Sequence, residues 1–109
     1  YEQALGISQE IGDRRGEGNR LGNLGLAYAA LGEVEKAIGY YEQALGISQE
    51  IGDRRGEGNR LGNLGLAYAA LGEVEKARQC WQQSLTIFEQ IKSPNAAVVR
   101  SWLDGLEGQ

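Results

Sequence analysis

Residues 1–37 read YEQALGISQEIGDRRGEGNRLGNLGLAYAALGEVEKA, and residues 41–77 repeat that stretch without a single change. Residues 38–40 (IGY) and 78–80 (RQC) complete two periods of 40 residues, and a third copy begins at Trp81 before it diverges. Self-similarity at a fixed period of about 20–50 residues is typical of repeat architectures, in which each unit buries its apolar face against its neighbours. The repetition therefore predicts a stacked array, produced either by recent duplication or by deliberate construction.

Each period contains two helical patterns. The apolar residues of the first pattern recur at i, i+3, i+7 and i+10, as on one face of a helix. They are Leu21, Leu24, Tyr28 and Leu31. The second pattern has helical spacing at Val34, Ala37, Ile38, Tyr41, Ala44, Leu45, Ser48 and Ile51. Neither pattern alternates as a half-buried strand would, so each unit is predicted to be a hairpin of two helices.

Turn and capping residues separate the predicted helices. Gly32 lies between the two patterns, where a glycine commonly terminates a helix. Gly52 follows the second pattern, and Asp53 is placed to cap the next helix by accepting bonds from backbone N–H groups. In the last copy, Ser93-Pro94 combines a capping serine with a proline at the first helical position.

The spacing of these residues resembles the signature of the tetratricopeptide repeat family. The matching positions are Leu24-Gly25, Tyr28, Gly32, Ala37, Tyr41 and Ala44, which recur as Leu64-Gly65, Tyr68, Gly72, Ala77 and Trp81. The period is longer than the family's usual length of about 34 residues, and the lengthened unit is similar to those of spindle-orientation adaptors and bacterial multi-repeat regulators. The resemblance implies an all-α fold in which antiparallel helical hairpins stack into a right-handed superhelix, an α-solenoid. It also implies that Gly25 and Gly65 let a neighbouring helix approach closely.

The sequence departs from the family pattern at three places. Gln49 stands where a proline commonly ends the second helix, Arg20 and Arg60 stand where a small residue is usual, and Asp104-Gly105 replaces the leucine–glycine pair. Gly22, Gly39 and Gly46 have no evident packing reason and are expected to loosen their helices.

The repeat predicts a division of the chain into four parts. Residues 1–12 are interpreted as the second helix of a truncated repeat, residues 13–52 as repeat one, residues 53–92 as repeat two and residues 93–109 as a C-terminal capping helix. The apolar face of the capping helix comprises Val98, Val99, Trp102, Leu103 and Leu106. The helix of residues 1–11, with Tyr1 and Leu5, is expected to pack on another chain, which together with the C-terminal helix gives a route to a homo-oligomer.

Composition argues against several classes of function. The chain has no histidine and one cysteine, Cys80, so neither the common acid–base residue nor an activated thiol is available, and we expect no enzyme activity, metal or cofactor. A net charge of −4 and a pI near 4.8 disfavour nucleic acid as a partner. No apolar run reaches the roughly 20 residues of a membrane span. Acidity and the lone thiol favour the cytoplasm.

A glycine-rich stretch imitates a nucleotide-binding loop but lacks its context. Gly12, Gly16 and Gly18 recur as Gly52, Gly56 and Gly58. Such a loop binds pyrophosphate only between a buried strand and a helix. Because a predicted helix precedes it here, we interpret the stretch as a hairpin linker.

The remaining function is protein or peptide binding, on the concave face that the resemblance assigns to the first helix of each repeat. The residues that lie off its apolar stripe are Asn19, Asn23, Leu26, Ala30, Asn59, Asn63, Leu66 and Ala70. Asparagine both donates and accepts hydrogen bonds, which suits the backbone of an extended peptide. In the family, the asparagine before the leucine–glycine pair often holds ligand backbone, which implies this role for Asn23 and Asn63.

Two questions stay open in the sequence. Arg20 and Arg60 either select acidic ligands in the groove or turn into the hairpin interface to pair with a carboxylate of the preceding helix. The array is predicted to be an interaction scaffold. The alternatives are the sensor or oligomerisation arm of a larger bacterial signalling or transcription regulator, and an engineered repeat scaffold with no specific ligand.

Overall fold

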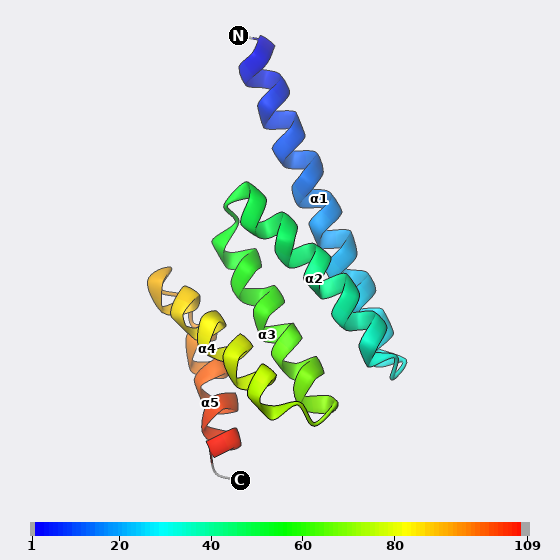
Figure 1. The fold of residues 1–109 in the computed structure, drawn as a ribbon. Coiled ribbons are helices and arrows are strands. Elements are labelled where there is room, and N and C mark those ends of the chain that lie inside the picture. The colour runs from blue at the N-terminus through cyan, green and yellow to red at the C-terminus, as the bar shows by residue number, and fades with distance from the viewer. Residues whose placement is uncertain (1, 108–109) are drawn as a thin grey trace.

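The computed structural model describes residues 2–107, and for residues 2–11 and 107 it describes the backbone only. Five helices follow one another in this part of the chain: α1 (Glu2–Ala30), α2 (Val34–Ile51), α3 (Arg54–Ala70), α4 (Val74–Gln90) and α5 (Asn95–Glu107). Each helix packs on the next in chain order, so α1/α2 and α3/α4 form hairpins and α5 covers α4 (Figure 1). The fold is an all-α helical-repeat solenoid, as predicted.

Glycines in the left-handed conformation end three of the helices. Gly32, Gly52 and Gly72 have φ angles of +81°, +71° and +78°. At the first of these turns the Glu33 N–H donates to the Tyr28 carbonyl at 2.9 Å, which closes the end of α1. Lys92 takes the same conformation at the end of α4, with φ +56°. The predicted glycine caps are therefore confirmed.

Side-chain caps begin α3 and α5. The Gly56 N–H donates to Asp53 Oδ1 at 3.0 Å at the start of α3. The Asn95 N–H donates to Ser93 Oγ at 3.1 Å before α5. Both contacts satisfy N–H groups that have no partner within the helix, so the predicted capping roles of Asp53 and Ser93 are confirmed.

Two clusters of buried residues hold the hairpins together. Ala37 and Tyr41 of α2 meet Leu64 and Ala67 of α3. Trp81 belongs to the second cluster, which also contains Ala77, Phe88 and Val99. Apolar burial of this kind is the main stabilising contribution to a stacked array.

The expected close approach at two glycines is also present. A Cβ atom at Gly25 would lie 2.5 Å from Tyr41 Cε1, and one at Gly65 would overlap Trp81 Nε1. The aromatic rings of α2 and α4 therefore pack directly on the backbone of α1 and α3. Gly39 and Gly46 have open space around them, as expected, whereas Gly22 is packed against Arg60. The expectation that Gly22 has no packing role was therefore wrong.

The predicted linker at residues 12–18 does not form a turn, because α1 continues through Gly12, Gly16 and Gly18. The identical sequence at Gly52 does end a helix. There the chain turns back so that α3 packs on α2, and this packing compensates for the backbone hydrogen bonds lost in the turn. Where no such packing acts, helix propagation adds a hydrogen bond with each residue and the helix continues. The prediction of a break after residue 12 was therefore wrong.

Burial differs between the two copies of the first apolar stripe. Leu64 is 3% exposed because α2 covers it, whereas Leu24 is 43% exposed. Within the described residues, no helix covers the corresponding side of α1. The side chains of Tyr1 and Leu5 lie outside the described residues, so packing of the N-terminal segment on another chain stays a prediction.

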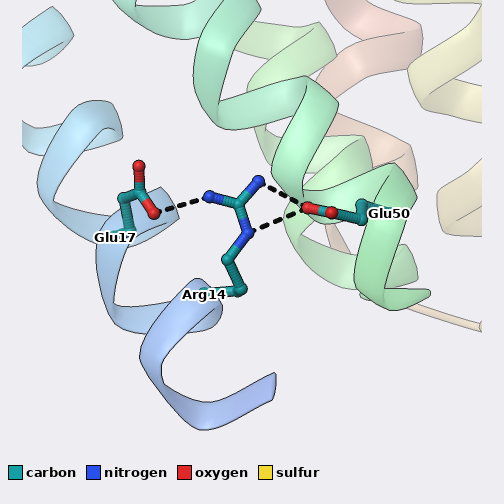
Figure 2. Close-up of polar contacts among 3 residues, drawn as sticks. All are labelled: Arg14, Glu17 and Glu50. Atoms are coloured by element: carbon teal, nitrogen blue, oxygen red, sulfur yellow. Dashed lines mark hydrogen bonds and ion pairs between the residues drawn. The ribbon is translucent and has the colours of Figure 1, made fainter. Parts of the chain in front are cut away.

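An ion-pair cluster joins α1 to α2 near the open end of the first hairpin. Arg14 Nε and Nη2 donate to Glu50 Oε2 at 2.9 and 2.5 Å, and Nη1 donates to Glu17 at 2.6 Å (Figure 2). These carboxylates raise the pKa of the Arg14 guanidinium. In the second hairpin the equivalent Arg54 bonds to Glu57 and to Gln90, so the cross-helix contact has a neutral acceptor there. The side chains of the cluster are about half exposed, so these ion pairs contribute little to stability.

Candidate functional site

A cavity of about 370 Å³ lies between α3 and α5. Its α3 side carries Asn59, Arg60 and Asn63, and its α5 side carries Val98 and Trp102. Leu26 of α1 and Phe88 of α4 complete the apolar part of the lining. The cavity is thus formed mainly by first helices of successive units, with α5 in the position of a third first helix.

A second cavity of about 230 Å³ continues from the first along α1 and α3. Leu26 and Asn63 line both cavities, and Leu66 and Ala70 extend the lining toward the C-terminal end of α3. Leu26 and Leu66 are 50% and 42% exposed. We call the two cavities together the groove. It offers the amide groups of Asn59 and Asn63 together with apolar side chains along both cavities.

The structure brings most of the predicted site residues together in this groove. Asn59, Asn63, Leu26, Leu66 and Ala70 line it. Asn19 lies beside it, since its Oδ1 accepts a hydrogen bond from Arg60 at 3.1 Å. The remaining two residues lie apart: Asn23 borders a separate surface hollow with Arg20 and Leu24, and Ala30 is exposed near the end of α1.

Arg60 reaches from α3 across the groove to α1. Its Nη2 donates to Asn19 Oδ1 at 3.1 Å and to the Gly18 carbonyl at 3.4 Å. A Cβ atom at Gly22 would lie 2.7 Å from Arg60 Cζ, so the guanidinium lies directly on the α1 backbone. The side chain therefore lies between successive first helices and also lines the larger cavity. No ion pair joins Arg60 to a carboxylate within residues 12–106, whose side chains are described.

The contribution of α5 to the groove was not predicted from the sequence. Asn95, Val98 and Trp102 line the larger cavity, whereas the sequence predicted only a capping role for the apolar face of this helix. Val98 and Trp102 are four residues apart and so lie on the same side of the helix. Val99, one residue on, is 1% exposed and packs into the core instead. The four-residue spacing of Val98 and Trp102 was the feature of the sequence that could have indicated a shared lining role.

Other chemically active groups in the described residues do not form a site. Cys80 is half-buried, and burial raises the pKa of its thiol, with a smaller contribution from the Glu42 carboxylate. The described residues hold no group of three or more histidine, cysteine or acidic side chains placed to bind a metal ion. In the same part of the chain, none of the helices combines the length and apolar character needed to cross a membrane.

The repeated hairpins correspond to matches with models of a known protein family. A family model described as tetratricopeptide repeat matches residues 1–50, and a second model of the same description matches residues 59–91. No curated protein matches the sequence. Repeats of this kind generally mediate protein–protein interaction and are generally non-catalytic modules. With both matches and a helical-repeat solenoid in hand, we conclude that the chain belongs to the tetratricopeptide repeat family.

Proposed function

We propose that the groove binds an extended peptide segment of a partner protein, and that the chain acts as an interaction scaffold without catalytic activity. The observation that supports this most directly is the position of Asn63. Its side chain lines both cavities, so its amide can donate to and accept from the backbone of a peptide that runs along α3.

Apolar contacts would supply much of the affinity. Leu26 and Leu66 are half exposed, although each offers a large apolar side chain. A ligand side chain that covers them removes apolar surface from water, which is favourable by about 25 cal/mol for each Å² buried. Asn59 and Asn63 then fix the register of the peptide, because a buried amide left without a partner would be unfavourable.

The test begins with selection of random linear peptides displayed on phage against the full chain. A recovered peptide is synthesised, and its affinity is measured by fluorescence anisotropy for the wild type and for Asn63→Ala. We expect the substitution to weaken binding by about tenfold, as for loss of a hydrogen-bonded contact in a desolvated site. Gln82→Ala, at an exposed position of α4 that lines neither cavity, is the control and should bind like the wild type.

The first copy of the repeat supplies a second comparison. Asn23 is the sequence equivalent of Asn63 but is exposed and lies outside both cavities. We expect Asn23→Ala to weaken binding less than Asn63→Ala does. Equal affinities for wild type and Asn63→Ala would contradict the proposal, as would failure to recover any binding peptide.

A further inference from the structure

One side of α1 is exposed although the identical side of α3 is buried. Leu24 is 43% exposed, whereas its equivalent Leu64 is 3% exposed. We call the side of α1 that carries Leu21 and Leu24 the uncovered face. Because residues 14–30 and 54–70 are identical in sequence, a segment that buries this side of α3 is also complementary to the uncovered face.

The segment that buries this side of α3 is the C-terminal part of α2. Tyr41 of α2 belongs to the same buried cluster as Leu64. Farther along the same contact, a Cβ atom at Gly56 would lie 2.8 Å from Ser48 Oγ. The later residue of α2 thus meets the earlier residue of α3, so the two helices run antiparallel where they touch.

The chain contains a second copy of this covering segment. Residues 1–11 are identical to residues 41–51. Since α1 continues through Gly12 as one helix, it carries residues 2–11 beyond the end of α2 (Figure 1). A continuous helix cannot fold back on itself, so this segment cannot cover the uncovered face of its own α1.

The register of the α2–α3 contact fits two copies of α1 at once. In α1 the equivalents of the two contacts pair Ser8 with Gly16 and Tyr1 with Leu24. Both pairs are centred on residues 12–13 of the chain. Two continuous α1 helices that lie antiparallel about a two-fold axis at this point therefore form each pair twice, because a two-fold interface is self-complementary.

The charges of the two surfaces are also complementary. Residues 1–11 carry two acidic residues, Glu2 and Glu10, and no basic residue, whereas residues 13–30 carry three arginines and two acidic residues. The net charges of the two segments are therefore −2 and +1. Arg20 borders the hollow on the uncovered face and has no ion pair with any side chain that the structure describes. Such complementarity favours encounter of the two surfaces.

We propose that the uncovered face of α1 binds residues 1–11 of a second copy of the chain, in a two-fold dimer in which each copy supplies this segment to the other. Each copy then receives the contact that α2 makes on α3. The exchange is a domain swap, in which the turn of residues 51–54 is replaced by continuous helix at residues 11–14. Gly12 lies at the crossing point, with open space where its Cβ atom would be, so the two backbones can approach closely there.

The test measures the mass of the full chain by sedimentation equilibrium, from micromolar to near-millimolar concentration. Leu24→Glu alters the uncovered face, and Leu5→Glu alters the segment that covers it. Leu31→Glu is the control, because Leu31 follows the end of α1 and is 73% exposed, and its equivalent Leu71 stays 43% exposed in the covered hairpin. Circular dichroism verifies that each variant is folded.

We expect the wild type to form dimers in this concentration range. Leu24→Glu and Leu5→Glu should each raise the dissociation constant of the dimer by about a hundredfold. Loss of one buried leucine contact changes an equilibrium by about tenfold or more, and a two-fold dimer contains each contact twice. Leu31→Glu should dimerise like the wild type.

A matched pair of proline variants tests whether the dimer requires a continuous α1. Arg14 lies inside α1, whereas its equivalent Arg54 is the first residue of α3. Proline is tolerated at the first position of a helix but breaks a helix interior. Arg14→Pro should therefore let residues 1–11 fold back on their own helix and give a monomer, whereas Arg54→Pro should remain a dimer. Each substitution removes one arginine that pairs with a glutamate, so the change in charge is the same.

Three results would overturn the inference. A wild type that stays monomeric at the highest concentration would show that the uncovered face does not bind a second copy. Dimers that persist unchanged in both Leu24→Glu and Leu5→Glu would assign association to another surface. Dimers that persist in Arg14→Pro would show that no exchange of the N-terminal segment takes place. All these measurements are made without peptide, so they are independent of the proposed function of the groove.

Discussion

Gly12 and Gly52 occupy the same position in two identical segments of sequence, yet Gly12 lies inside α1 and Gly52 ends α2 with φ +71°. The residues before Gly52 belong to α2, which packs on α1 and on α3. Tyr41 and Ala44 of this helix are buried. The local sequence is therefore compatible with a continuous helix and with a turn, and tertiary packing selects between them.

Alanine substitution at the two glycines should have opposite effects on stability. Gly12→Ala places a good helix former at an open position of α1 and should raise the free energy of unfolding by about 1 kcal/mol. Gly52→Ala forces a side chain into the left-handed region and should lower it by about 1 kcal/mol. Urea denaturation followed by circular dichroism measures both. Changes of the same sign would contradict the difference in conformation.

The contact between Gly65 and Trp81 should tolerate no added methyl group. A Cβ atom there overlaps the indole, and repacking of a rigid ring in the core should lower the free energy of unfolding by about 1–3 kcal/mol or more. Gly62→Ala, one turn earlier, meets Ser84 Oγ and Trp102 Cζ3 at an ordinary 3.6 Å and should not destabilise the protein, because alanine favours the helix. The same denaturation assay compares them. Equal decreases in the free energy of unfolding for Gly65→Ala and Gly62→Ala would contradict this packing.

Gly22 offers a way to move Arg60 without replacing it. A Cβ atom at Gly22 would lie 2.7 Å from Arg60 Cζ, so Gly22→Ala should displace the guanidinium while the helix remains intact. We expect Gly22→Ala to weaken binding of a display-selected peptide by several-fold, because Arg60 lines the larger cavity and its displacement would change the surface that contacts the peptide. Gly46→Ala, with open space around it, is the control. Unchanged affinity for the selected peptide would show that the position of Arg60 does not matter for binding.

Stability should fall at alkaline pH. Burial raises the pKa of the Cys80 thiol above its ordinary value of 9.0, and burial likewise raises the pKa values of Tyr41 and Tyr68. Above about pH 9 the unfolded chain releases protons that the folded chain retains, so the free energy of unfolding decreases as pH rises. Cys80→Ala should make the decrease shallower without removing the tyrosine contribution. Urea midpoints across this range measure the slope, and a stability that rises with pH would contradict the prediction.

The parts of the fold that depend on local chemistry were predictable from the sequence. Gly32 and Asp53 act as caps because their backbone and side-chain properties decide the conformation of the next few residues. The continuity of α1 was not predictable in this way. It depends on which helices pack against a segment, and identical residues 1–37 and 41–77 carry no difference that could report this.

The groove was predictable only in part, for a related reason. Helical spacing placed Asn63 and Leu66 off the packing stripe, and both line the groove. The position of Arg60 depends on how closely α1 and α3 approach at Gly22, which spacing within one repeat does not give. Trp102 lies in the diverged third copy, where the repeat pattern no longer indicates which residues face the groove.

The most direct test of peptide binding in the groove is a nuclear magnetic resonance titration of the labelled chain with a display-selected peptide. The proposed function predicts the largest changes at the side-chain amides of Asn59 and Asn63, with smaller changes around Leu26, Leu66 and Trp102. Residues of α2 and α4 that face away from the groove, such as Gln43 and Gln82, should change little. Shifts concentrated on α2 and α4, with Asn59 and Asn63 unchanged, would contradict it.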